Sequence, residues 1–100
     1  MVQTKAEVVK LLAEHQAEIH RFAVLRLGLF GSFAKETNGP ESDVDLLVEF
    51  EPEGKTFRNF IGLVFFLEDL LHRKVELVTP ESISPYMRDE ILKEAEHVLA

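Results

Sequence analysis

The chain has no cysteine and no tryptophan among its 100 residues, and it carries few positive charges. Without cysteine it can form neither a disulfide framework nor a thiolate metal site. Its 11 lysines and arginines are outnumbered by 18 acidic residues, which gives a net charge of −7. Proteins that bind a nucleic-acid backbone draw much of their affinity from lysine and arginine, so direct nucleic-acid binding is not expected.

Long apolar segments are also missing. The longest uninterrupted apolar run is 63–67, which is far too short to cross a membrane. The first ten residues, MVQTKAEVVK, contain no apolar core of signal-peptide length. We therefore expect a cytoplasmic protein without a membrane partner.

The composition and length suit one small domain over 1–100, with 46% hydrophobic residues. Thr4 and Glu7 form a capping box ahead of apolar residues at helical spacing. Four helices are predicted: one over 5–21, a short one directly after Gly31, one over 56–72, and a last one that starts at Ser84. The last helix is expected to face the core with Met87, Ile91, Ala95 and Val98. Three strands are predicted, at 24–30, 43–50 and 74–78. This order favours an α/β (α+β) fold, a small mixed sheet of about three strands with helices packed on one face.

Asp43 and Asp45 stand at the start of the strand predicted over 43–50. Side chains two apart on a strand share a face, so both carboxylates point away from the helices. Glu76, in the strand predicted over 74–78, also faces the open side, and three carboxylates can converge there. Neighbouring carboxylates resist joint ionisation, so a cation is expected between them. Oxygen ligands suit Mg²⁺ or Mn²⁺, and two such ions can clamp the oxygens of a phosphoryl-type displacement.

Gly31 and Ser32 lie between a predicted strand and a predicted helix. Backbone N–H groups at such a junction attract phosphate, and glycine allows the backbone to approach it closely. The Ser32 hydroxyl can hydrogen-bond a phosphate oxygen. A triphosphate held at Ser32 would have its α-phosphorus near Asp43 and Asp45.

The stretch GSFAKETNGPESDVDLLV resembles the signature of the minimal nucleotidyltransferases, within the DNA polymerase beta-like superfamily. That signature is a glycine–serine pair, ten residues and Asp-x-Asp, which Gly31-Ser32, 33–42 and 43–45 match in spacing. The later stretch LEDLLHRKVELVTPESISPYMRDEILKEA is similar to the family's C-terminal half, where a third carboxylate precedes Val-Thr-Pro. The resemblance covers nearly the whole chain.

The resemblance implies a polymerase beta-like nucleotidyltransferase fold and transfer of a nucleoside monophosphate, usually AMP from ATP, with release of pyrophosphate. Asp43, Asp45 and Glu76 would bind one or two Mg²⁺ or Mn²⁺ ions, and Glu76 would help deprotonate the acceptor hydroxyl. The nucleotide is expected at Gly31, Ser32, Lys35 and Ser42. Small members commonly pair with a helical HEPN-domain toxin as its antitoxin, and some adenylylate a tyrosine on it.

Two departures from the family pattern bear on activity. The third carboxylate is usually aspartate, whereas this chain has Glu76, whose extra methylene shifts the carboxylate by more than about 1 Å. The family often has Arg-Gly where this chain has Lys35-Glu36, which replaces a bidentate fork by a point charge and adds a negative charge. Both departures leave a weakened site as an alternative.

Three functions stay open on these residues. The first is adenylylation of a HEPN toxin, and the second is an antitoxin that neutralises the toxin by binding alone. The third is nucleotidyl transfer to a small molecule, against which the lack of a second lobe counts. The segment Gly54-Lys55-Thr56 is interpreted as a turn and helix cap, because Glu49 occupies the place of the first P-loop glycine.

The helix predicted over 56–72 is apolar around about half its circumference. One face against a small sheet needs an apolar arc of only about 100°. Either this helix is buried deeply, or it carries a surface for a partner or a second copy around Phe66 and Leu70. The second interpretation is slightly favoured, because a partner could supply the missing lobe.

Overall fold

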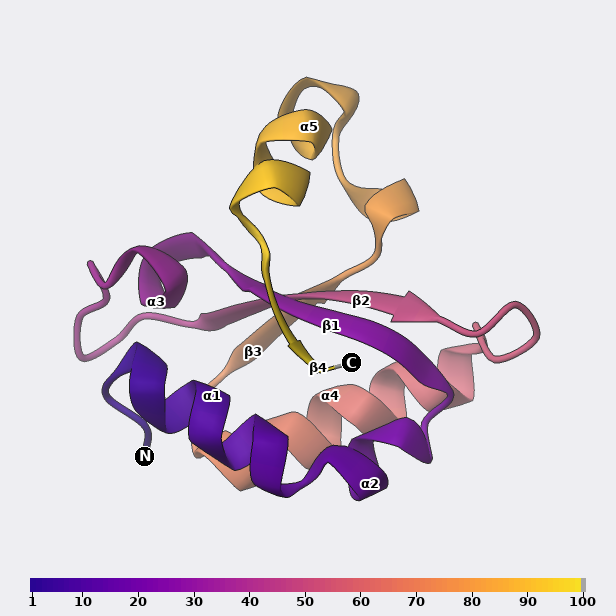
Figure 1. The fold of residues 1–100 in the computed structure, drawn as a ribbon, viewed down its shortest axis with the longest axis horizontal. Coiled ribbons are helices and arrows are strands. Elements are labelled where there is room, and N and C mark those ends of the chain that lie inside the picture. The colour runs from indigo at the N-terminus through magenta and orange to yellow at the C-terminus, as the bar shows by residue number, and fades with distance from the viewer. Residues whose placement is uncertain (100) are drawn as a thin grey trace.

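The computed structural model describes residues 1–99 as an open four-stranded sheet with helices on both sides (Figure 1). Its strands are β1 (Val24–Phe30), β2 (Val44–Phe50), β3 (Val75–Val78) and β4 (Glu96–Leu99). Its helices are α1 (Lys5–Glu14), α2 (Gln16–His20), α3 (Gly31–Lys35), α4 (Phe57–Leu71), the single 3₁₀ turn η1 (Pro80–Ser82) and α5 (Pro85–Glu94). The three strands predicted from the sequence are confirmed, and β4 is an addition to them.

The strand order is β3-β2-β1-β4, so β1 and β2 form the centre of the sheet. β1 is antiparallel to both β2 and β4, whereas β2 and β3 are parallel. A parallel pair needs a crossover, and α4 supplies it. The sheet is therefore mixed, as expected.

The main core lies between the sheet and the layer formed by α1, α2 and α4 (Figure 1). On β2, Val44, Leu46 and Val48 are fully buried against this layer. Asp45 alternates with them and lies on the other face, as the period of two predicts. The open face of the sheet is therefore the face that carries the carboxylates.

The helix predicted over 5–21 is broken at His15. Its N-terminal capping box is confirmed, since Glu7 N–H donates to the Thr4 hydroxyl and Glu7 Oε1 accepts from Thr4 N–H. At His15 the backbone leaves helical geometry (φ −112°, ψ 25°), and the ring Nδ1 lies 2.9 Å from Leu11 O. The side chain thus binds a carbonyl near the end of α1, and α2 starts in a new direction.

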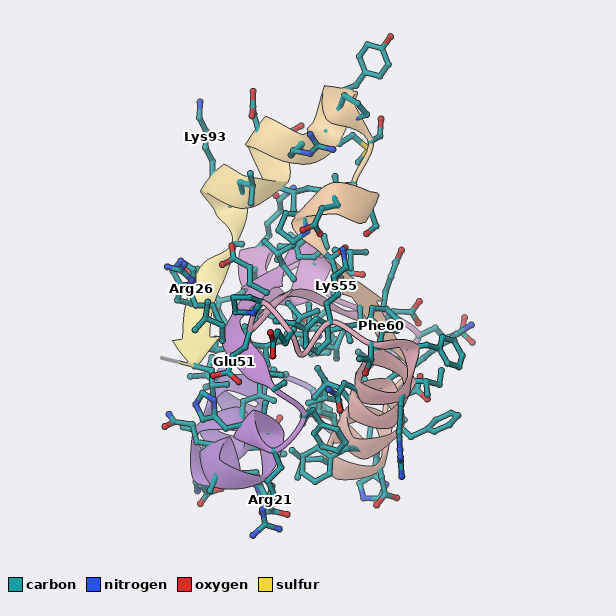
Figure 2. All side chains as sticks on the ribbon, turned by 90° about the vertical axis from the view of Figure 1, so that its right-hand side faces the viewer. Arg21, Arg26, Glu51, Lys55, Phe60 and Lys93 are labelled. Carbon is teal, nitrogen blue, oxygen red and sulfur yellow. The ribbon has the colours of Figure 1, made fainter. Side chains whose placement is uncertain are left out.

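The prediction for the last helix is wrong in two respects. The helix starts as expected, with Ser84 as N-cap and Pro85 in the first turn, but it ends at Glu94. None of its residues is buried, and Met87 is 53% exposed. Figures 1 and 2 show α5 projecting from the side of the sheet opposite to α1 and α4. The segment that follows pairs with β1 as β4, a long-range contact that local periodicity does not reveal.

α4 has the predicted bounds, because the Thr56 hydroxyl accepts from Asn59 N–H and His72 ends the helix in the left-handed region. Phe66, however, packs on Phe22 with ring centroids 5.7 Å apart. Phe66 and Leu70 are partly buried against the core, so they are not freely exposed, and a partner surface around them stays a prediction. The exposed aromatic residues of α4 are Phe57 and Phe65. No helix within residues 1–99 has the length and apolar character needed to span a bilayer.

Leu25 faces solvent, although simple alternation would place it with the buried Leu27 and Leu29. The pairing with β2 shifts register between Val24 and Arg26, which leaves Leu25 as the extra residue of an irregularity. Such a bulge reverses the side-chain direction locally.

We predict that Leu29→Ala lowers the free energy of unfolding by about 2–5 kcal/mol, because it opens a cavity in the core.

Leu25→Ala is the matched control on the same strand. Its expected cost is within about 0.5 kcal/mol, as for other surface substitutions. Urea denaturation of both variants measures the difference. Equal losses would contradict the placement of Leu25 outside the core.

Candidate active site

Asp45 and Glu76 lie side by side on the open face of the sheet. The parallel register of β2 and β3 pairs Asp45 with Glu76, and Val44 with Val75. Directly paired residues on neighbouring strands point to the same face. Glu76 is exposed and Asp45 is partly buried. The structure thus brings together two of the three predicted carboxylates by backbone pairing alone.

Burial and the neighbouring Glu76 carboxyl raise the pKa of Asp45 from its usual 3.8 to about 6, with a smaller contribution from Asp43. Burial acts because a carboxylate in a low-dielectric environment is costly, and Glu76 acts because like charges resist joint ionisation. Asp43, the residue before β2, is therefore close enough for its charge to reach Asp45. All three predicted carboxylates belong to one electrostatic cluster.

Gly31 connects the end of β1 to α3 directly against Asp45. Phe30 pairs with Asp45 in the sheet, and the chain then turns at Gly31 with φ +73°. A Cβ at this position would overlap the Asp45 carboxyl group. Any other residue would be strained in backbone and would also push the carboxylate away. Gly31 was predicted to let a ligand approach the backbone closely. In the structure it is the Asp45 carboxyl group that lies close to it.

Ser32 follows Gly31 in the first turn of α3 and is partly exposed. Two other predicted nucleotide ligands already have partners in the protein. Lys35 Nζ lies 3.4 Å from Glu94 Oε1 at the end of α5. The Ser42 hydroxyl accepts from Gly39 N–H at 2.8 Å and thereby closes a turn. Their assignment to the nucleotide stays a prediction.

The fit of a divalent cation follows from the donor set. No three His, Cys, Asp or Glu side chains of residues 1–99 are grouped closely enough to hold a metal ion by themselves. Mg²⁺ usually takes one or two carboxylates, keeps several waters and shares phosphate oxygens, so it does not need a closed protein cage. Asp45 and Glu76, with Asp43 nearby, provide oxygen ligands of this kind on an open face. The residues therefore fit a cation that a nucleotide helps to bind.

Arg73 was assigned no role from the sequence, although it is buried and its Nη1 donates to the carbonyl oxygen of Ser42, the residue before Asp43. Its signal was present, because 73, 75 and 77 share one strand phase and the residues at 75 and 77 are apolar. An arginine in the buried phase of a strand pattern needs internal partners. In the structure these partners are backbone carbonyls, among them those of Val2 and Ser42.

The nucleotidyltransferase domain family matches residues 9–98, almost the whole chain. The chain therefore belongs to the nucleotidyltransferase domain family, and the predicted polymerase beta-like class is confirmed. It is 36% identical over 96 residues to the protein adenylyltransferase MntA of Thermococcus cleftensis, an alignment that covers 95% of this chain and 96% of that protein.

Solved structures agree with this classification. A minimal nucleotidyltransferase superposes with a TM-score of 0.78 at 33% identity, over 93% of this chain and 94% of that one. The MNT antitoxin complex with a tri-AMPylated HEPN toxin of Shewanella oneidensis contains a chain that aligns with a TM-score of 0.58 at 19% identity. That alignment covers 96% of this chain and 69% of the other, and it shows a shared fold.

The raised pKa of Asp45 predicts a pH-dependent stability. A carboxyl group with a higher pKa in the folded state contributes stability that is complete below its unfolded pKa and is lost as the pH rises through the folded value. The melting temperature of the metal-free protein should therefore fall between about pH 4 and about pH 7, and Asp45→Asn should reduce this fall. Thermal unfolding followed by circular dichroism across this range is the measurement.

Asp69→Asn is the control, because Asp69 is an exposed aspartate on α4. It should leave the pH profile of the melting temperature as it is in the unaltered protein. If Asp45→Asn gave the same profile as Asp69→Asn, the crowded environment assigned to Asp45 would be wrong.

Proposed function

We propose that this protein transfers AMP from ATP to a hydroxyl group of a HEPN-domain toxin, with Mg²⁺ as cofactor, and thereby acts as its antitoxin. The observation that carries the proposal is the Asp45–Glu76 pair on an open sheet face, with Gly31 and Ser32 at its edge. Protein adenylyltransferase activity is the named activity of the Thermococcus cleftensis relative, and AMPylation of a HEPN toxin is named for the Shewanella oneidensis complex.

The residues would divide the reaction between them. Asp43, Asp45 and Glu76 would hold Mg²⁺, which when bound neutralises phosphate charge and orients the α-phosphate for in-line attack. The Ser32 hydroxyl and nearby backbone N–H groups would hold the triphosphate. Glu76, which is more exposed than its paired residue Asp45, would accept the proton of the acceptor hydroxyl. The acceptor oxygen then bonds to the α-phosphorus as the bond to pyrophosphate breaks.

The openness of the site favours a protein acceptor. Glu76 is exposed on β3, the edge strand of the sheet, and no second lobe of this chain covers it within residues 1–99. α5 rises on the same side of the sheet and leaves its large apolar side chains in solvent, with Tyr86 97% exposed. A macromolecular acceptor can fill this space and exclude water, which electrostatic catalysis requires. A small acceptor would stay largely hydrated.

An antitoxin that acts by binding alone is the second candidate, and one contact favours it. Glu94 holds Lys35, the cation that replaces the family's arginine, so this charge is directed toward α5. A nucleotide would have to compete with Glu94 for it. Transfer of label from ATP to the toxin separates the two candidates, because binding alone leaves the toxin unlabelled.

Replacing Asp43 and Asp45 together by asparagine should abolish transfer of AMP from ATP radiolabelled at the α-phosphate. Asparagine keeps the shape of both side chains but removes the charge that attracts the cation. The acceptor is the product of the gene adjacent to the one for this chain, and circular dichroism checks that the variant is folded.

The matched control is the double variant Glu14→Gln with Glu18→Gln, which removes the same charge from two exposed positions on α1 and α2, on the other side of the sheet. It should label the acceptor as the unaltered protein does. Undiminished labelling by the Asp43 and Asp45 variant would exclude these carboxylates from the site.

We further propose that the toxin contacts the exposed side of α4. Phe57 and Phe65 are 79% and 64% exposed and lie two helical turns apart, on one face. Phe57 also borders a cavity of about 540 Å³ with Leu77 and Thr79 of the neighbouring strand region. This surface reaches the β3 edge, so a protein bound there can extend around the edge to Glu76.

The consecutive residues Phe65 and Phe66 provide a direct test. Phe65→Glu should weaken binding of the HEPN protein at least about tenfold, with little change in melting temperature, because it charges an exposed contact residue. Phe66→Glu should instead lower the melting temperature strongly, since its ring packs on Phe22. Calorimetric titration and thermal unfolding measure both effects. Unchanged binding by Phe65→Glu would place the interface elsewhere.

A further inference from the structure

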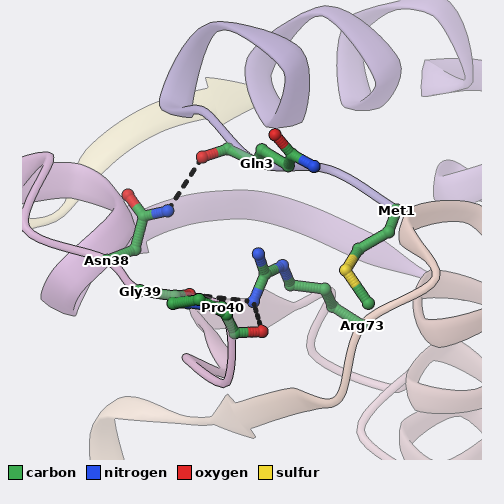
Figure 3. A pocket seen from close by; sticks show the side chains of 6 residues that line it. All are labelled: Met1, Gln3, Asn38, Gly39, Pro40 and Arg73. Carbon is green, nitrogen blue, oxygen red and sulfur yellow. Dashed lines mark hydrogen bonds between the residues drawn. The ribbon is translucent and has the colours of Figure 1, made fainter.

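Arg73 is a buried cation whose hydrogen-bond acceptors within residues 1–99 are all backbone carbonyls. It is 8% exposed and lies in the turn between α4 and β3. Its Nη1 donates to the carbonyl oxygens of Gly39, Pro40 and Ser42 at 3.2, 3.0 and 2.9 Å. Figure 3 shows the guanidinium directed at the Gly39–Pro40 backbone. A buried charge is costly without hydrogen-bond partners, so these bonds fix the position of the guanidinium group relative to the three carbonyls.

The same side chain joins two further parts of the chain. Its Nε donates to Val2 O at 2.7 Å, and its guanidinium carbon lies 4.9 Å from the centroid of the Phe33 ring in α3. Asn38 adds a parallel link, because its Nδ2 donates to Gln3 O at 2.8 Å. Arg73 thus holds the loop that joins α3 to β2 against the N-terminal segment and α3.

The peptide groups on both sides of Asp43 are hydrogen-bonded to the Arg73–Lys74 dipeptide. On one side, Arg73 Nη1 binds Ser42 O, and on the other side Val44 N–H donates to Lys74 O at 2.9 Å. Asp43 is therefore the single residue between two fixed peptide groups. Asp45, by contrast, is held within the sheet by its register with Glu76.

We propose that Arg73 is a positioning residue, which fixes the backbone at Asp43 so that this carboxylate joins Asp45 and Glu76 in binding a divalent cation. The proposal rests on the proposed function in taking Asp43 as a metal ligand. Arg73 itself touches neither the cation nor the nucleotide. Residues that orient metal ligands in this way commonly affect metal affinity about 10- to 100-fold.

The loop has room to move if these hydrogen bonds are lost. A cavity of about 310 Å³ lies beside the guanidinium, bordered by Met1, Gln3 and Asn38 (Figure 3). Lysine keeps the charge of arginine but carries one ammonium group, which cannot reproduce donors on both Nε and Nη1. Arg73→Lys should therefore release the loop before Asp43 while keeping the buried positive charge.

The test is the affinity for Mn²⁺ alone, measured from the electron paramagnetic resonance signal of free Mn²⁺. The variants are Arg73→Lys and Arg73→Met, and the control is Arg21→Lys, whose side chain points away from the sheet into solvent (Figure 2). Arg73→Lys should remain folded, bind Mn²⁺ about 10- to 100-fold more weakly, and exchange the amide hydrogens of 38–44 faster. Arg21→Lys should match the unaltered protein in all three measurements.

A folded Arg73→Lys variant with unchanged Mn²⁺ affinity would overturn the proposal. Failure of both Arg73 variants to fold would also overturn it, since the residue would then serve the whole fold. AMP transfer by the unaltered protein is assayed in parallel. Mn²⁺ binding without transfer would contradict the proposed function and leave the role of Arg73 intact. Absence of Mn²⁺ binding by the unaltered protein would overturn the role of Arg73, whereas the proposed function is decided by the transfer assay.

Discussion

The parallel pairing of β2 with β3 is the constraint on which the site depends, because it places Asp45 directly beside Glu76. Two neighbouring carboxylates, one of them partly buried, oppose ionisation, and the pKa of Asp45 rises to about 6 as a result. The sheet maintains this unfavourable arrangement through hydrogen bonds and the buried side chains of β2. The position of the Asp45 carboxyl group also requires glycine at 31, since a larger residue there would occupy the space of this group.

The local patterns in the sequence were sufficient for much of this arrangement. The helix caps at Thr4 and Thr56, the period-two alternation around Asp45 and the strand-to-helix turn at Gly31 all depend on neighbours in the chain, and the structure confirms them. β4 could not be predicted this way, because its strand conformation comes from pairing with β1, about 70 residues earlier. The burial of Arg73 likewise depends on carbonyls that belong to distant loops.

The proposed function divides the reaction between this protein and a HEPN-domain toxin. The chain supplies a sheet with carboxylates, the turn at Gly31-Ser32 and a helix on the open side. In the proposed function the toxin supplies the acceptor hydroxyl and covers the reacting groups. In the proposed function the toxin would also cover the part of α4 that the core leaves exposed. Arg73 would then link the rigid sheet to the loop that carries Asp43.

The central claim is that the crowded carboxylates are a cation site, and the ionisation of Asp45 is its most direct measure. The ¹³C chemical shift of the Asp45 carboxyl carbon, followed by NMR during a pH titration, gives its pKa with and without Mg²⁺. The account predicts a pKa near 6 in the metal-free protein and a clear decrease when Mg²⁺ saturates the site, because the cation displaces the proton. A pKa that does not respond to Mg²⁺, alone or with ATP, would contradict the account.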